Sequence, residues 1–137
     1  MAIKLDLTSL ENALQRLTEA LHALDAAPQN TLYRDATIQR FEYSYELAHK
    51  MLKRYLEMAA ANPVRIDELA FPDLIRTGNE QGLLRSGWDK WTTYRKARSI
   101  TSHTYDEAKA IEVLAIVPDF LQEARFLLSE LQSRGSA

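Results

Sequence analysis

Two residues with complementary chemistry, Arg98 and His103, stand five positions apart in the run Arg-Ser-Ile-Thr-Ser-His-Thr-Tyr. An arginine stays charged at any working pH and can grip a phosphate with two parallel N–H donors, and a histidine exchanges protons near neutrality. Metal-free RNA cleavage needs a base for the ribose 2′-hydroxyl, an acid for the departing 5′-oxygen and a cation for the charge on phosphorus. The chain therefore offers half of a symmetric two-histidine arrangement for that reaction.

The path of the chain between these two residues decides whether they can act together. Positions five apart on one continuous α-helix point about 140° away from each other. The run Thr104-Tyr105-Asp106-Glu107 is a capping-box pattern, which predicts that the last helix starts immediately after His103. If Arg98 ends one helix and His103 lies in the turn before the next, both side chains can face one cleft.

Composition predicts an all-α protein with one domain over residues 1–137. The 137-residue chain is 46% hydrophobic, with four Gly and four Pro, and residues that lose little on entering a helix dominate it. It has no cysteine, which excludes disulfides and thiolate metal sites. We expect a cytoplasmic protein without membrane association. Met1–Asp6 lacks a basic region followed by an apolar run, and no apolar stretch approaches the ~20 residues that cross a bilayer.

Periodicity and turn signals predict an antiparallel bundle of four main helices with an additional short helix. The first helix begins with the capping-box pattern Thr8–Glu11 and ends at Pro28. The second spans about residues 31 to 61 and is capped by Asn30 or Thr31. One seam of the first helix consists of Leu10, Leu14, Leu17, Leu21 and Leu24.

Turn signals in the middle of the chain predict the additional short helix and, after it, a further main helix. Pro72 suits the first turn of a short helix, and Gly78 or Gly82 can close it. The next helix is capped by Ser86 and runs to about Ile100.

The last helix is expected to bend at Pro118, because proline removes a backbone hydrogen bond. Its tail from Ser133 to Ala137 is expected to fray. The residues expected to face inward are Ile111, Leu114, Val117, Leu121, Ala124, Leu128 and Leu131.

Charge is uneven along the chain. The formal net charge of −2 argues against a general nucleic-acid coat protein, which must neutralise many phosphates. Just before His103, however, five cations stand against one anion, Asp89. These cations are Arg85, Lys90, Arg95, Lys96 and Arg98. This basic patch is either a solvated helix face or an RNA-binding surface to which Lys90, Arg95 and Lys96 contribute.

The remaining histidines and the tryptophans have ordinary structural interpretations. His22 lies off the leucine seam and is expected on the surface. His22, His49 and His103 lie on separate segments without carboxylate pairs at ligand spacing, so we expect neither a metal nor another cofactor. Trp88 and Trp91 are core or interface anchors, and base stacking by one of them is the alternative.

Two stretches of the chain resemble the HEPN superfamily, in particular the HepT-like branch, also called nucleotidyltransferase substrate-binding proteins. The first is the spacing Arg-x4-His-x-Tyr with the run Thr101-Ser102-His103-Thr104-Tyr105-Asp106. The second is Arg34–Ala48, which His49 follows where the family often has an aromatic residue. The polar residues of this second stretch either make structural ion pairs or line a nucleotide site. They are Arg34, Asp35, Arg40 and Glu42.

The resemblance implies a HEPN-like helical fold and a homodimer whose two motifs face each other across one cleft. It makes Arg98 and His103 the catalytic pair, with Ser99, Ser102 and Asp106 in support. Ser99 is shorter than the polar amide or acid that follows the arginine in many members. DNA would bind without being cut, because it lacks the 2′-hydroxyl nucleophile.

Tyr105 has a separate role in the HepT-like branch, where a minimal nucleotidyltransferase transfers AMP onto the motif tyrosine. Such a bulky anion beside the cleft would exclude RNA by sterics and by charge repulsion.

Three functions then compete. They are a toxin-type endoribonuclease restrained by that antitoxin, a non-catalytic nucleotide- or substrate-binding subunit of the nucleotidyltransferase, and a plain helical dimer. In the last, Arg98 pairs with an acid such as Asp106 and His103 caps a helix. The two matching stretches favour the first.

Overall fold

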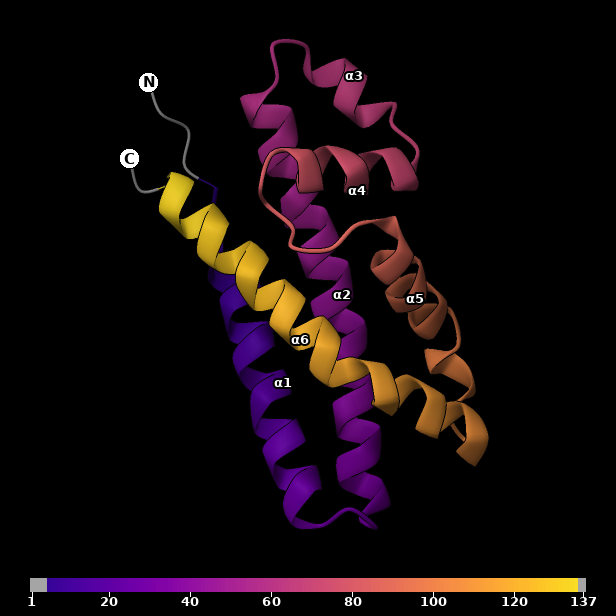
Figure 1. The fold of residues 1–137 in the computed structure, drawn as a ribbon. Coiled ribbons are helices and arrows are strands. Elements are labelled where there is room, and N and C mark those ends of the chain that lie inside the picture. Colours follow the sequence, from indigo (N-terminus) through magenta and orange to yellow (C-terminus); the bar gives the residue numbers. More distant parts are fainter. Residues whose placement is uncertain (1–4, 136–137) are drawn as a thin grey trace.

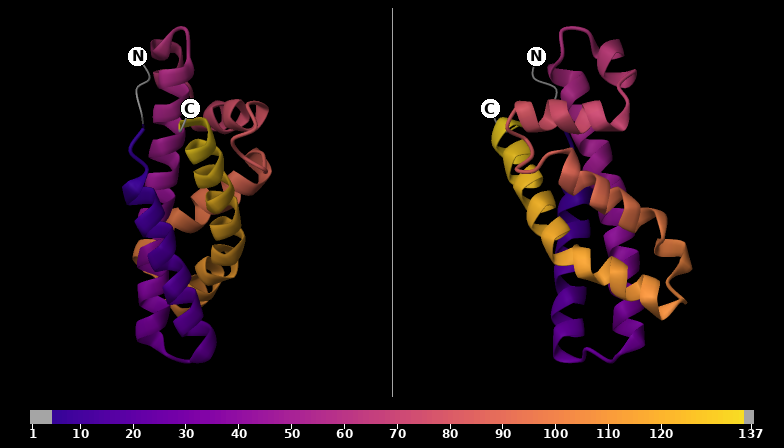
Figure 2. Two further views of the ribbon diagram at one scale, coloured as in Figure 1. Left: turned by 90° about the vertical axis from the view of Figure 1, so that its left-hand side faces the viewer. Right: turned by 45° about the vertical axis from the view of Figure 1, so that its right-hand side comes forward.

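The first two helices form an antiparallel hairpin along one side of the molecule (Figures 1 and 2). The computed structural model describes residues 5–135. Helix α1 is Thr8–Ala26 and α2 is Thr31–Ala59. Asn30 caps α2 as predicted, because its Oδ1 accepts a hydrogen bond from the Tyr33 N–H at 3.0 Å. The leucine seam faces inward: Leu10, Leu14 and Leu17 are fully or almost fully buried.

The predicted capping box of the first helix is wrong. Leu7 occupies the cap position of α1 and makes no side-chain hydrogen bond to the helix. The Thr8 N–H instead donates to Asp6 Oδ1 at 3.0 Å, and this contact lowers the pKa of the Asp6 carboxyl. A carboxylate two positions upstream thus accepts the Thr8 N–H that the capping box assigned to the Glu11 side chain, and the Glu11 N–H donates to the Leu7 carbonyl oxygen.

Two short helices cross the far end of α2. Helix α3, Pro63–Asp67, was not predicted; it begins where Asn62 Oδ1 accepts the Val64 N–H at 3.2 Å. Helix α4, Phe71–Glu80, is the predicted short helix and has Pro72 in its first turn. Of the two candidate closing glycines, Gly82 has the left-handed backbone, with φ +77°.

Helix α5, Trp88–Ser99, and the 3₁₀ turn η1, Thr101–His103, follow. The predicted serine cap of α5 is wrong: Gly87 occupies the cap position, without a side-chain hydrogen bond. The Ser86 N–H instead donates to the carboxyl group of Glu123. This orients the loop before α5 toward α6.

Helix α6, Glu107–Gly135, contains Pro118 and is visibly curved in Figure 2. It begins four residues after His103, and the predicted capping box is again wrong. The Asp106 carboxyl group accepts the Ala108 N–H at 2.9 Å, while the Thr104 hydroxyl donates to the Thr101 carbonyl oxygen at 3.1 Å. Asp106 therefore caps the helix, in place of the threonine.

The inward face of α6 differs in part from the predicted one. Ile111 is wrong as a core residue, because 54% of it is exposed. The buried face of α6 includes Val113, Val117, Phe120 and Leu127, each of which is completely buried. The predicted fraying from Ser133 is wrong for the part that is described, since the helix continues to Gly135; residues 136–137 lie outside the described residues.

The predicted fold class, an all-α antiparallel four-helix bundle with an additional short helix, is confirmed, with α3 and η1 added to it. Helices α1, α2, α5 and α6 form the bundle, and α4 lies across the end of α2 (Figure 1). Edge-to-face and tilted ring contacts build an aromatic centre from Phe41, Tyr45, Trp91, Tyr94 and Phe120. Within residues 5–135, every helix is too short or too polar to traverse a bilayer.

Candidate active site

Arg98 lies in the last turn of α5 and is held by two acids of α2. Its Nε donates to Glu46 Oε1 at 2.9 Å, and its Nη2 lies 3.5 Å from Glu42 Oε1. Its Nη1 also donates to the Thr101 hydroxyl at 3.3 Å. The side chain remains 32% exposed. The ion pairing expected for a structural arginine is thus present, with Glu42 and Glu46 as partners in place of Asp106.

His103 is the last residue of η1 and is exposed. The turn is held through its backbone: the His103 N–H donates to the Ile100 carbonyl oxygen at 3.0 Å, and the Asp106 N–H donates to the His103 carbonyl oxygen at 3.1 Å. Among the described residues, its imidazole makes no hydrogen bond or ion pair. The nearest ring is that of Tyr105, edge-on with centroids 6.2 Å apart. The imidazole therefore faces solvent, open to a substrate or to a second chain.

Tyr105 is the most exposed large hydrophobic residue of the described part of the chain, at 87%. It borders a cavity of about 310 Å³ between the starts of α2 and α6. In this cavity Arg34 Nη1 lies 3.4 Å from Glu107 Oε1, and the Arg34 Nε is buried without a partner. The phenol is thus accessible and close to His103.

The three residues expected to support the motif have other contacts. The Ser99 hydroxyl donates to the Lys96 carbonyl oxygen at 2.6 Å, within its own helix. Asp106 caps α6, and Ser102 is exposed. None of them makes a side-chain hydrogen bond or ion pair to Arg98 or His103 within the described part of the chain.

The basic residues of α5 face three different surroundings. Arg95 and Arg98 border a groove of about 330 Å³ between α2, α4 and α5. Lys96 borders a separate groove against α6. Lys90 lies 3.6 Å from Asp119 Oδ2, so its charge is partly neutralised. Of the three candidate RNA contacts, Arg95 is therefore the one that shares a groove with Arg98.

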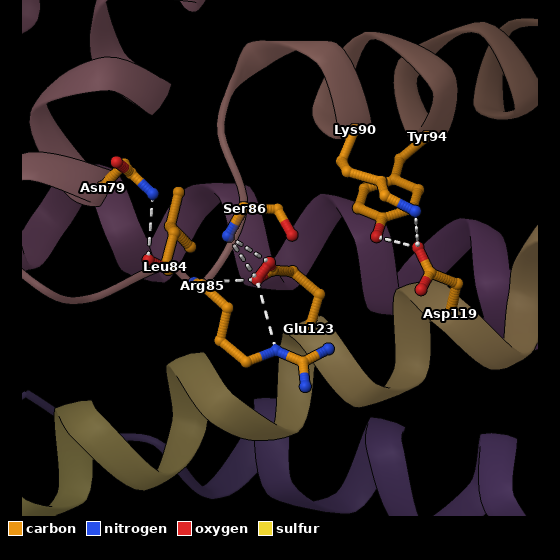
Figure 3. A network of polar contacts seen from close by, with 8 residues as sticks. All are labelled: Asn79, Leu84, Arg85, Ser86, Lys90, Tyr94, Asp119 and Glu123. Carbon is orange, nitrogen blue, oxygen red and sulfur yellow. Dashed lines mark hydrogen bonds and ion pairs between the residues drawn. The ribbon is translucent and has the colours of Figure 1, made fainter.

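A buried glutamate beneath the start of α5 escaped the sequence analysis. Glu123 is completely buried, and its carboxyl group accepts the backbone N–H groups of Arg85 at 2.9 Å and Ser86 at 3.1 Å (Figure 3). One turn earlier on α6, Asp119 accepts a hydrogen bond from the Tyr94 hydroxyl at 2.5 Å. These contacts fix the loop and helix that carry Arg98. The available signal was spacing, because position 123 falls on the apolar stripe of α6.

Burial changes the pKa of several side chains around the groove. It lowers the pKa of His49 below 6.5, which favours the neutral imidazole. It raises the pKa of Tyr45, and with the Asp119 hydrogen bond it also raises the pKa of Tyr94. Both phenols therefore stay protonated. Among the described residues, no three His, Cys, Asp or Glu side chains gather in a way that could hold a metal ion.

Comparisons with known proteins place the chain in a family. The family model described as "Nucleotidyltransferase substrate binding protein like" matches residues 5–133. A Haemophilus influenzae protein named "Probable ribonuclease HepT" is 41% identical over 143 residues, which cover 98% of this chain and 97% of the relative.

Two solved structures share the fold. One, from Haemophilus influenzae, is described as the substrate-binding domain of a nucleotidyltransferase. It has a TM-score of 0.86 and 36% identity, over 93% of this chain and 99% of that one. The other, from Thermus thermophilus, has a TM-score of 0.67 and 32% identity, over 89% and 98% of the two chains. On this evidence the chain belongs to the HepT-like family of nucleotidyltransferase substrate-binding proteins.

Proposed function

We propose that this chain is the toxin of a two-protein toxin–antitoxin module, a metal-independent endoribonuclease restrained by a minimal nucleotidyltransferase. The observation that best supports this is the placement of Arg98 and His103 on either side of one turn, both partly or fully exposed. The name of the 41% identical relative supports the ribonuclease activity, and the family description supports a nucleotidyltransferase as partner.

The proposed reaction needs two copies of the motif. The His103 imidazole of one copy takes the proton of the ribose 2′-hydroxyl, and the 2′-oxygen attacks the adjacent phosphorus. The bond from phosphorus to the 5′-oxygen breaks, and the second copy's His103 gives that oxygen a proton. The products are a 2′,3′-cyclic phosphate and a 5′-hydroxyl. A homodimer provides both histidines, which fits the absence of any polar partner for this imidazole in the described part of one chain.

Arg98 has to bind the scissile phosphate in this scheme. Its contacts to Glu46 and Glu42 at 2.9 and 3.5 Å orient the guanidinium without burying it. Approach of the phosphate replaces one carboxylate partner by another anion, which forms two parallel hydrogen bonds with the guanidinium.

Tyr105 is the proposed point of restraint. Its phenol oxygen attacks the α-phosphorus of ATP, pyrophosphate leaves, and AMP remains on the tyrosine. The 87% exposure of the side chain allows access by the nucleotidyltransferase. Because the ring lies 6.2 Å from that of His103, the added phosphate and nucleoside would occupy the space that RNA needs.

The test is cleavage of a mixed RNA pool in excess chelator by the wild type, His103→Ala and the matched control His22→Ala, which alters an exposed histidine that borders a separate pocket between α1 and α6. Wild type and His22→Ala should cut and leave cyclic phosphate ends, and His103→Ala should cut roughly 100- to 10,000-fold more slowly. Preincubation with the partner nucleotidyltransferase and ATP should abolish RNA cleavage by the wild type and leave cleavage by Tyr105→Phe unchanged. Equal inactivity of the three proteins, with the dimer intact and Tyr105 unmodified, would refute the proposed ribonuclease activity.

A second candidate function is a non-catalytic subunit that presents a nucleotide or substrate to the nucleotidyltransferase. It is favoured by one observation, the ion pairs of Arg98 with Glu42 and Glu46, because a purely structural arginine makes the same kind of contact. Failure of cleavage combined with stable binding to the nucleotidyltransferase would select it.

A further inference from the structure

The groove beside Arg98 has a polar rim and an aromatic wall. It measures about 330 Å³ and lies between the middle of α2, the first residue of α4 and the last turns of α5. It is lined by Tyr45, Glu46, His49, Phe71, Arg95 and Ser99, with Arg98 at one edge. Residues from three helices that are far apart in the sequence thus meet next to the motif arginine.

Phe71 forms a rigid platform within this groove. The His49 ring packs against it with centroids 4.5 Å apart, and Trp88 meets it edge-to-face at 5.6 Å. Burial keeps His49 neutral by lowering its pKa, so the imidazole contacts Phe71 as an aromatic surface. Three rings from α2, α4 and α5 therefore hold one another in place.

Arg95 lies on this platform and has no acidic partner among the described residues. Its Cζ is 5.1 Å from the centroid of Phe71, in the geometry of a cation–π contact. Within residues 5–135 its guanidinium makes no hydrogen bond or ion pair, in contrast to Arg98, and its side chain is exposed. The Phe71 ring lies on one side of the guanidinium, and because the Arg95 side chain is exposed, part of the planar group faces solvent.

We propose that this groove is a stacking subsite for a nucleobase of single-stranded RNA, in which the base lies on the outer face of the Arg95 guanidinium. The inference rests on the proposed function, because it places the base next to the phosphate that Arg98 would hold. Arg95 and Arg98 are three residues apart on α5, a rise of about 4.5 Å along the helix axis, so one nucleotide can reach both. Guanidinium planes and aromatic rings are the surfaces on which proteins stack unpaired bases.

The chemistry of the groove favours a base over a second phosphate. Glu46 lines it beside Arg95 and Arg98, and its carboxylate can accept hydrogen bonds from the N–H groups of a base, which a phosphate without donors cannot offer. The tryptophans considered from the sequence do not serve as the stacking surface. Trp91 is completely buried, and Trp88 packs against Phe71 in a T-shaped arrangement.

The test uses binding, so that it does not depend on cleavage. A fluorescently labelled oligodeoxyadenylate and an abasic oligomer of the same length carry the same phosphates, and neither has the 2′-hydroxyl needed for cutting. Fluorescence anisotropy then measures how much affinity the bases add. In the wild type we expect the base-containing oligomer to bind roughly 5- to 150-fold more tightly, the range for one stacked base.

Three variants locate that difference. Arg95→Lys keeps the charge and loses the planar surface, and Phe71→Leu keeps the apolar volume and loses the ring; both should bring the two oligomers close to equal affinity. The matched control Lys96→Gln alters a cation of the same helix outside this groove. It should weaken both oligomers by the same factor and leave their ratio unchanged. Circular dichroism of each variant verifies that the fold is retained.

Two outcomes would overturn the inference. One is equal binding of the two oligomers by the wild type, including no binding of either. The other is an unchanged ratio in both folded variants, Arg95→Lys and Phe71→Leu. Loss of the proposed function would look different, because a chain that never cuts RNA could still show the preference for bases and its dependence on Arg95.

Discussion

Replacing Glu123 by leucine should destabilise the fold although leucine is the more apolar residue. Glu123 is completely buried, and a single oxygen, Oε1, accepts the backbone N–H groups of Arg85 at 2.9 Å and Ser86 at 3.2 Å. These two donors belong to the main chain, so no side-chain substitution can remove them. In Glu123→Leu both lose their acceptor in a partly buried site.

The magnitude follows from two opposing effects. An unsatisfied buried donor costs about 1–3 kcal/mol, so two of them cost roughly 2–6 kcal/mol. Burial of the leucine side chain returns about 1.5–3 kcal/mol. The hydrogen-bond loss is the larger effect, and we expect Glu123→Leu to lower the free energy of unfolding by about 2 kcal/mol. Glu123→Gln retains an acceptor oxygen for both donors and should lose about 1 kcal/mol or less.

The assay is equilibrium urea unfolding followed by far-UV circular dichroism at neutral pH. Glu112→Leu is the matched control, because Glu112 is exposed on the same helix, and it should stay within about 0.5 kcal/mol of the wild type. A Glu123→Leu variant as stable as this control would refute the reasoning. It would mean that the loop amides find other acceptors and that Glu123 does not hold the start of α5.

Two further predictions concern the groove wall and the packing of α4. Burial lowers the pKa of His49 in the folded chain below its ordinary value of 6.5. As the pH falls below neutrality, the unfolded chain therefore takes up a proton at His49 before the folded chain does, and the free energy of unfolding decreases. His49→Gln should show a smaller fall in urea unfolding between neutral and mildly acidic pH, and an equal fall in both proteins would contradict this. At Gly78, a Cβ would lie 3.0 Å from Leu52 Cδ1 and 3.1 Å from Leu84 Cδ1, so Gly78→Leu should cost about 2 kcal/mol or more by overpacking. Gly135→Leu, which enters open space, should change the unfolding free energy by less than about 0.5 kcal/mol, and similar losses for both variants would rule out overpacking as the cause.

Helix positions were predictable because they depend on local periodicity and on proline and glycine. The ends of α1 and α2, the proline in α4 and the closing Gly82 all follow from residues within a few positions. Of the four predicted side-chain caps, that of α2 by Asn30 formed, and the other three failed for a related reason. Asp6 and Asp106 each lie two positions from the expected hydroxyl residue and accept other amides of the first turn, those of Thr8 and Ala108. At α5 the N–H of Ser86 donates to Glu123 on a distant helix.

The motif was predictable in its position but not in its contacts. The placement of Arg98 at a helix end and His103 in a turn follows from the run itself, whereas the choice of Glu42 and Glu46 as partners depends on how α5 packs across α2. Phe71 had no signal in the sequence, because the residues it meets come from other helices. The single domain, the homodimer and the roles of the site residues stay predictions.

The contacts around the motif also determine when the site can exist. The hydrogen bond from Arg98 to Glu46 joins residues 52 positions apart, and that from Arg34 to Glu107 joins residues 73 positions apart. During synthesis the α1–α2 hairpin emerges first. The turn that holds His103 connects α5 to α6, so it is held at both ends only when α6 has left the ribosome. A chain that stops before α6 contains every motif residue without their arrangement. The arrangement of Arg98 and His103 described here therefore requires translation of the whole bundle.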